Sequence, residues 1–338
     1  MPRSFPLTIF SFLHFFGLAS AGLAALFVLN NFFIIGLDAP GILNVLGLGT
    51  SMGIVIPKSG FSDQMMWFGY AQLATAAAIL FWAANRSLND ENLRNDAAFM
   101  DSASAFIIRA AFWGVFLVGL LDAVLSFMRV EGFHISVFGD SLGALIALPS
   151  GRGTYFHIPL MIVCVIIALK DKSISLIWLT FLVVIAEFLI VIARFIYGYE
   201  QTFMGDLVRF WYAALFLFAS AYTLKEDGHV RVDVLYAGLK HRTKCILNSS
   251  GSLFFGLPLC WLILVRGMWN KTSLINSPML SFETSMSGFG MYIKYMMAAF
   301  LIIFAVSMIF QFTSYLFDSL ADIRDKVEKE ETSEVVTH

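Results

Sequence analysis

Eight long apolar runs constrain the fold of this chain more than any other feature of its sequence. An α-helix needs roughly 20 apolar residues to cross the hydrocarbon core of a bilayer. Within lipid, a helix satisfies nearly all of its backbone polar groups inside one segment. The sequence therefore predicts an all-α integral membrane protein with about eight transmembrane helices. The runs lie at about 8–33, 64–84, 104–127, 156–169, 174–197, 207–224, 245–265 and 291–315.

The fourth run, 156–169, is short for a membrane span. We expect it either to include residues from Gly153–Tyr155 or to be tilted or partly re-entrant. The preceding stretch, 129–155, and the stretch 37–63 are long, glycine-rich and apolar, which predicts interfacial helices or lids. Within 129–155, the sequence SGRGT at 150–154 is expected to form a simple turn in a loop.

The composition supports a membrane location and argues against nucleic-acid binding. Charged residues make up 14% of the chain and hydrophobic residues 59%, whereas soluble domains carry about 25% charged residues. A soluble core could not bury this much apolar surface. The net charge is −2, and the cationic residues lie at the ends of the apolar runs rather than on one face.

Lysine and arginine are distributed unevenly over the loops between the runs. They are more numerous in the loops that share a side with the N-terminus, which by the positive-inside rule predicts that both termini are cytoplasmic. The first run follows Arg3 without a clear cleavage site, so it is expected to be a first span rather than a removed signal peptide. The charged segment 321–338 is then a cytoplasmic tail.

Histidine and cysteine give no pattern for a cofactor or a catalytic site. Two axial histidines must face one haem at similar depth, but His14 is expected near the inside end of its span and His157 near the outside end of its own. The three cysteines, Cys164, Cys245 and Cys260, lie in or beside apolar runs without metal-site spacing. The sequence predicts no catalytic residue, no metal, no cofactor and no enzyme activity.

Two acidic residues within the apolar runs are candidate intramembrane polar sites. Asp122 lies in the third run and Glu187 in the middle of the fifth. A charge in the membrane is costly unless it is paired or hydrated. Each is interpreted either as part of a proton or ion relay, or as a buried polar contact to a neighbouring helix or a partner subunit.

The turn between the fifth and sixth runs is flanked by two acids and two bases, Arg194, Glu200, Asp206 and Arg209. These charges can neutralise one another at the bilayer edge. We expect them to fix this helical hairpin, with the long stem of Arg209 reaching Asp206 or the interface.

Three stretches in this region resemble a known family. They read ARFIYGYE (193–200), FMGDLVRFWYAALFLFASAYTL (203–224) and EDGHVRVDVLY (226–236). Together they resemble the small, DctQ-like membrane subunit of tripartite ATP-independent periplasmic (TRAP) transporters. The segment from Gly228 to Asp233 matches the family pattern Gly/Ala-His-Val/Ile-Arg-Val-Asp throughout. The residues that carry the match are Arg194, Asp206, Arg209, Gly228, His229, Arg231 and Asp233, which are therefore candidate subunit contacts.

The sequence departs from the family pattern at two positions. The family typically has an acidic segment, often led by Trp, that contains Glu-Glu-Leu-x-Arg. Here that segment reads Gly205-Asp206-Leu207-Val208-Arg209, so Gly205 replaces one acid, and Phe203 replaces the Trp. The resemblance covers roughly 174–320. We therefore expect a four-helix family core at 171–320, preceded at 1–170 by an extension of about four more spans.

The resemblance implies a function as well as a fold. It implies a multi-pass protein of the bacterial inner membrane that acts as a scaffold in ion-driven organic acid uptake. The implied partners are a large TRAP membrane subunit, which carries the substrate, and a periplasmic solute-binding protein that delivers it. Two alternatives remain open at this point: a membrane anchor subunit of a redox complex, and a self-sufficient channel or carrier.

Overall fold

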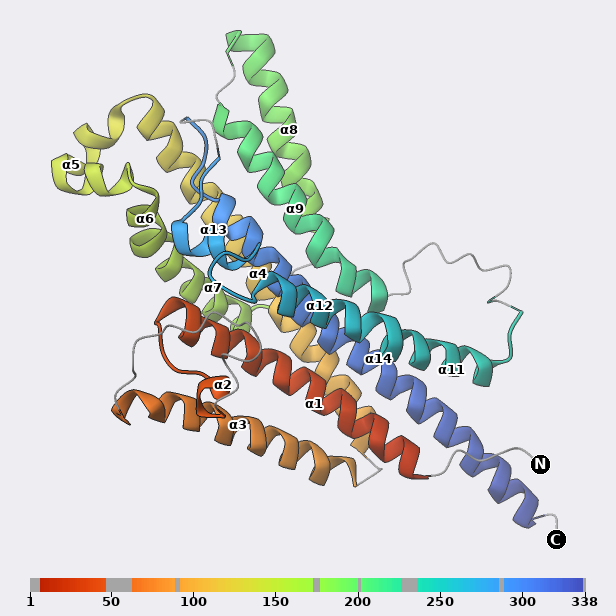
Figure 1. Cartoon of the computed structure of the whole chain (residues 1–338). Helices are drawn as coiled ribbons and strands as arrows, with labels where there is room; N and C mark the ends of the chain where they lie inside the picture. Colours follow the sequence, from red (N-terminus) through yellow and green to blue (C-terminus); the bar gives the residue numbers. More distant parts are fainter. Residues whose placement is uncertain are drawn as a thin grey trace. The chain divides into compact units, whose positions relative to one another are not determined.

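The structure is a computed structural model that describes residues 7–46, 63–88, 92–172, 177–199, 202–225, 236, 238–285 and 289–336. This part of the chain is helical and contains no strand (Figure 1). Eight of its helical segments are long and apolar enough to cross a membrane, which confirms the predicted all-α class and the number of spans. They are Ile9–Gly36, Met65–Ser87, Leu93–Val130, Pro149–Lys170, Ile177–Ile196, Phe203–Leu224, His241–Gly267 and Lys294–Asp325.

The described helices follow one another along the chain. In order, they are α1 (Leu7–Asn31), η1 (Phe32–Gly36), α2 (Ile42–Val45), α3 (Asp63–Ser87), α4 (Leu93–Val130), α5 (Phe133–Ile146), α6 (Pro149–Arg152), η3 (Gly153–His157), α7 (Ile158–Lys170), α8 (Ile177–Tyr197), α9 (Thr202–Lys225), α11 (His241–Gly251), η4 (Ser252–Gly256), α12 (Leu257–Gly267), α13 (Asn276–Ser281) and α14 (Lys294–Val336). The η segments are π-helical turns that continue an adjoining α-helix.

The chain forms two compact units, and each combines separate stretches of sequence. The first unit comprises 1–104, 223–270 and 305–338; the second comprises 105–222 and 271–304. The long helices α4 and α14 therefore each contribute one part to each unit. The proposed boundary near residue 170, between an extension and a family core, stays a prediction.

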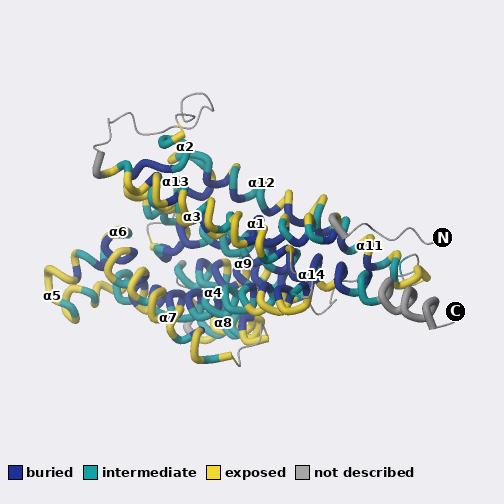
Figure 2. The backbone as a smooth tube through the Cα atoms, turned by 90° about the horizontal axis from the view of Figure 1, so that it is seen from below, coloured by how far each residue is buried: buried dark blue, intermediate teal, exposed yellow. Residues whose placement is uncertain are grey.

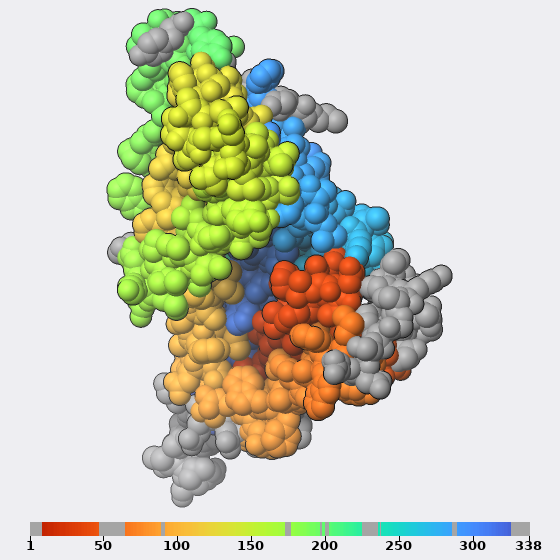
Figure 3. Space-filling view, turned by 90° about the vertical axis from the view of Figure 1, so that its left-hand side faces the viewer, coloured from red at the N-terminus to blue at the C-terminus, as the bar shows by residue number. Residues whose placement is uncertain are grey.

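In the first unit, α1 contacts α3, α12 and the second half of α14. The surfaces of α1 and α3 adjoin in the space-filling view (red and orange in Figure 3). Trp261 of α12 donates a hydrogen bond from its indole nitrogen to the hydroxyl of Ser20, at 2.8 Å. At Gly17, an added Cβ would lie 2.5 Å from the ring of Phe317. Glycine therefore permits the close approach of α1 to α14, as small residues do between membrane helices.

The core of the second unit is apolar and draws on α4, α8, α9 and the segment that leads into α14. Its buried centre includes Phe210 and Phe218 of α9, which contact Phe300 of α14 at ring-centroid distances of 5.1 and 5.2 Å. Trp211 donates a hydrogen bond to the carbonyl of Val115, at 3.1 Å, so that its polar nitrogen is satisfied within the core.

The prediction of a turn before the fourth span is wrong. The stretch 150–154 is not a turn in a loop: Pro149 starts α6, and the helix continues through η3 into α7. The fourth span thus begins before the predicted 153–155 and reaches a full spanning length. Upstream, the stretch 129–155 contains α5, which is apolar, mostly exposed (yellow in Figure 2) and kinked at Gly139, where φ is 76°. Its expected role as an interfacial helix or a lid stays a prediction.

Candidate functional site

Asp122 is the centre of a buried polar cluster in the second unit. Its side chain is fully buried in α4. Its Oδ1 accepts hydrogen bonds from Arg152, at 2.8 Å, and from the imidazole of His157, at 3.2 Å. Its Oδ2 accepts one from the backbone nitrogen of Tyr292, at 2.8 Å, and a longer one from Ser126, at 3.4 Å. Every oxygen of this carboxylate is therefore satisfied inside the protein.

Arg152 is the cation that balances Asp122, and it is itself fully buried. Its guanidinium also donates to the carbonyl of Ile146, at 3.1 Å from Nε and 3.0 Å from Nη2. The ring of Tyr292 lies 4.5 Å from the guanidinium carbon. A planar guanidinium suits such a site because it forms several directed hydrogen bonds and stacks on an aromatic face at once.

His157 completes the cluster through both ring nitrogens. Nε2 lies 3.2 Å from Asp122 and Nδ1 lies 2.8 Å from the hydroxyl of Tyr295. A neutral imidazole protonated on Nε2 satisfies both contacts, since Nε2 then donates to the carboxylate and Nδ1 accepts from the tyrosine. The geometry matches the second interpretation of Asp122, a buried polar contact between helices.

Asp206 connects the start of α9 to the segment before α14. Its Oδ2 accepts from the Ser285 hydroxyl and from the backbone nitrogen of Met291, both at 3.0 Å. Its Oδ1 lies 3.3 Å from Nη1 of Arg209, whose side chain is largely exposed. The expected pairing of Asp206 with Arg209 is thus present. Arg194 lies in the last turn of α8 and is exposed, and Glu200 lies outside the described residues.

Glu187 differs from Asp122 in its surroundings. It lies in the middle of the span Ile177–Ile196 and is exposed on the surface of this chain. No described residue of the chain pairs with it. The neighbouring Ala186 points to the core, whereas Val184 and Phe188 are exposed on the same side as Glu187.

The remaining family-motif candidates, Gly228, His229, Arg231 and Asp233, lie outside the described residues. Their role as subunit contacts stays a prediction.

Sequence reasoning missed two participants in buried ion pairs. It assigned Arg152 to a loop, although the need of Asp122 for a cation was a signal that a nearby arginine is internal. It also assigned no partner to His14. His14 is buried in the first unit, and its Nε2 lies 2.8 Å from Asp96, a carboxylate that Arg86 also contacts at 2.8 Å.

The fold and these clusters define a multi-pass helical membrane protein whose described internal charges are mostly paired. Residues 181–321 match the family model of the DctQ component of tripartite ATP-independent periplasmic transporters. No curated protein and no solved structure matched the chain. Residues 181–321 are therefore similar to the DctQ component of these transporters, which confirms the resemblance found in the sequence.

The Asp122 cluster contains residues from both before and within the matched stretch. Asp122, Arg152 and His157 all precede residue 181, whereas Tyr292 and Tyr295 lie within the match. The hydrogen bonds of Asp122 to Tyr292 and of His157 to Tyr295 therefore join residues that precede the match to residues within it, inside the second unit.

Proposed function

We propose that this chain is the small scaffold subunit of a TRAP-type secondary transporter of the bacterial inner membrane. It supports a large membrane subunit, which carries an organic acid across the bilayer with a coupling ion. A periplasmic binding protein delivers that acid. The chain itself acts on no substrate chemically. The family match over 181–321 supports the class of transporter.

The observation that carries the scaffold role is the contrast between Asp122 and Glu187. A carrier needs polar groups that remain available to its substrate or ion, but Asp122 is fully occupied by neighbouring side chains and backbone. Glu187 is instead presented outward from the centre of a span. A carboxylate facing lipid at that depth is costly, so a polar or cationic group of a partner subunit is its natural counterpart.

The outward face of α8 has the form of a helix-packing surface. Large exposed residues recur along it at alternating spacings of four and three, which is the periodicity of a left-handed helix–helix seam. Glu187 lies beside this stripe. The stripe consists of Ile177, Phe181, Val184, Phe188, Val191 and Phe195. A helix of the large subunit would cover it and supply the partner of Glu187.

Co-purification with a large TRAP subunit tests this proposal, with variants in the family motif as the comparison. The tagged chain is co-expressed with a large TRAP subunit, solubilised in mild detergent and purified. We expect the two proteins to elute together, and Arg231→Ala or Asp233→Ala to reduce the yield of the complex or the uptake that it supports. Normal association and uptake in both variants would remove the turn from the partner interface.

The two alternatives from the sequence gain no support from the described residues. Of the two histidines considered for a haem, His157 uses both ring nitrogens and His14 contacts Asp96. A self-sufficient carrier would most simply use Asp122, which Arg152 already neutralises.

A further inference from the structure

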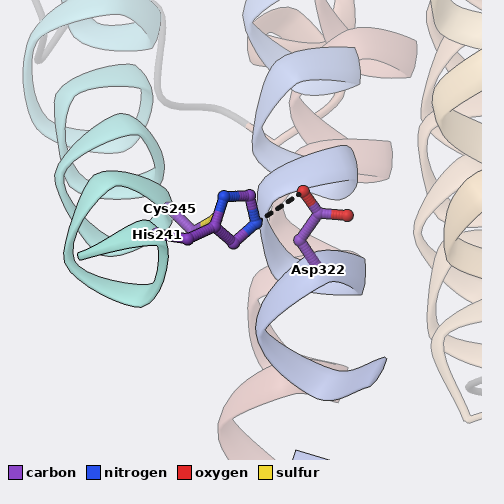
Figure 4. Close-up of side chains that lie close together, drawn as sticks. All are labelled: His241, Cys245 and Asp322. Atoms are coloured by element: carbon purple, nitrogen blue, oxygen red, sulfur yellow. Dashed lines mark ion pairs between the residues drawn. The ribbon is translucent and has the colours of Figure 1, made fainter. Parts of the chain in front are cut away.

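A histidine, a cysteine and an aspartate come together in the first unit, away from the Asp122 cluster. His241 begins α11, and Cys245 follows one turn later on the same face of that helix. Asp322 faces them from α14 (Figure 4). The ligating atoms of the three side chains all lie within 4.8 Å of one another. Linear spacing hides this set, because Asp322 is far from the other two in sequence.

The separation of His241 and Asp322 is that of two ligands at a tetrahedral metal site. Nε2 of His241 lies 3.4 Å from Oδ2 of Asp322. Zinc binds nitrogen and oxygen at roughly 2.0–2.1 Å, so two such ligands on a tetrahedron are separated by about 3.3–3.4 Å. Cys245 is buried beside them and supplies the sulfur. An imidazole, a thiolate and a carboxylate are the three side-chain types that zinc uses most.

The second oxygen of Asp322 is held by another residue. Arg94 of α4 donates from Nη2 to Oδ1 of Asp322, at 3.1 Å, and also contacts Asp325. This leaves Oδ2 directed at His241. Outer contacts that orient a ligating carboxylate in this way are typical of protein metal sites.

The cluster borders a polar cavity that provides room for a fourth ligand. The cavity has a volume of about 550 Å³ and is lined by His241, Cys245 and Asp322 together with further oxygen donors, among them Asp101 and Asp318. Three protein ligands and one position open to such a cavity leave space for a water molecule or a second carboxylate. His241 and Asp322 are partly exposed, so an ion can enter from solvent.

We propose that His241, Cys245 and Asp322 bind a divalent transition metal ion, preferentially Zn²⁺, with one coordination position open to the cavity. The ion joins the start of α11 to α14 and so fixes the seventh span against the eighth. It replaces a partly exposed histidine–aspartate contact with three metal–ligand bonds. The site is independent of any partner subunit, since all three ligands belong to the first unit of this chain.

Cobalt provides a direct test, because Co²⁺ occupies zinc sites and a thiolate–Co²⁺ bond gives a near-ultraviolet charge-transfer band. The full chain, purified in detergent with a histidine-free tag and stripped with a chelator, is titrated with Co²⁺. We expect one saturable equivalent with intense, tetrahedral-type visible bands and the charge-transfer band. Addition of Zn²⁺ should displace the cobalt and raise the thermal midpoint of the stripped protein.

Cysteine variants form the matched control. Cys245→Ser should abolish the charge-transfer band, whereas Cys164→Ser and Cys260→Ser, which change equally buried thiols elsewhere, should keep it. His241→Ala and Asp322→Asn retain the thiol and should lower Co²⁺ affinity by about 10-fold or more. Absence of the band in the wild-type chain, or its persistence in Cys245→Ser, would overturn the proposal and leave the three residues as an ordinary ion pair beside a buried thiol.

Discussion

At the scale of single residues, the Asp122–Arg152 pair shows how this chain accommodates charge in its interior. Both side chains are fully buried, and both are saturated by neutral or oppositely charged partners. Removing one partner of such a pair leaves an uncompensated buried charge, which costs more than the intact pair gains. The pair is therefore expected to matter for stability chiefly when it is broken on one side.

Arg152→Met should lower the free energy of unfolding by about 3–5 kcal/mol, because Asp122 then lacks its cation. The double variant Asp122→Leu with Arg152→Met removes both charges and should recover much of that loss. Chemical denaturation of the purified chain in detergent measures both. Equal destabilisation by the single and the double variant would show that the charge balance is unimportant and that the shape of Arg152 alone matters.

Sequence reasoning found Asp122 and missed its partner Arg152. Asp122 stood out because it interrupts an apolar run, whereas Arg152 follows Pro149 and Gly151 in a stretch that has the composition of a turn. Only the tertiary contact with Asp122 makes it favourable to bury that arginine in a helix. The same holds for His241, Cys245 and Asp322, whose proximity depends on how α11 packs on α14.

At the scale of helices, the number and approximate bounds of the spans were predictable because every apolar run except the fourth is long enough to specify its own helix. The start of the fourth span was not, since α6 and η3 are rich in glycine and polar residues. These residues become helical because Arg152 and His157 bury their side chains around Asp122.

The close packing around Gly17 leads to a second prediction, which concerns stability. An added Cβ there would meet the buried ring of Phe317, so Gly17→Leu should separate α1 from α14 and destabilise the chain by about 1–3 kcal/mol. Gly114→Ala is the matched control, because nothing lies within 4 Å of its added Cβ. Thermal unfolding followed by light scattering distinguishes them, and comparable losses in both variants would contradict a specific close approach.

The exposed face of α8 leads to a third prediction, which concerns binding of the large subunit. Glu187→Leu should leave the isolated chain stable, since the carboxylate has no partner among the described residues, but should weaken binding of the large subunit. Glu187→Gln retains hydrogen-bonding capacity and should have a smaller effect. Asp140→Asn, on exposed α5, is the control. Quantitative co-purification measures all three, and unchanged binding in Glu187→Leu would mean that this face meets lipid.

At the scale of the whole molecule, residues before the family match and residues within it are buried in the same cores. In the second unit Asp122 and His157 contact Tyr292 and Tyr295, and in the first unit Trp261 contacts Ser20. Both units thus combine residues from before and within the matched stretch 181–321. The residues before the match therefore pack within the same two units as the matched residues.

A chain that begins at residue 171 should therefore fail to accumulate in the membrane as a monodisperse protein. It would expose the apolar residues that α1 and α4 cover and leave the polar groups of Tyr292 and Tyr295 without their partners. Size-exclusion chromatography of the truncated and full chains, expressed in parallel, tests this expectation. A well-behaved truncated protein would show that the family core is self-sufficient.

Transport by defined components tests the scaffold role most directly. Proteoliposomes containing this chain alone are compared with proteoliposomes containing the co-purified complex with the large subunit, each supplied with the binding protein and an ion gradient. We predict gradient-dependent uptake of an organic acid by the complex and none by the chain alone. Uptake by the chain without a second membrane subunit would contradict the scaffold assignment.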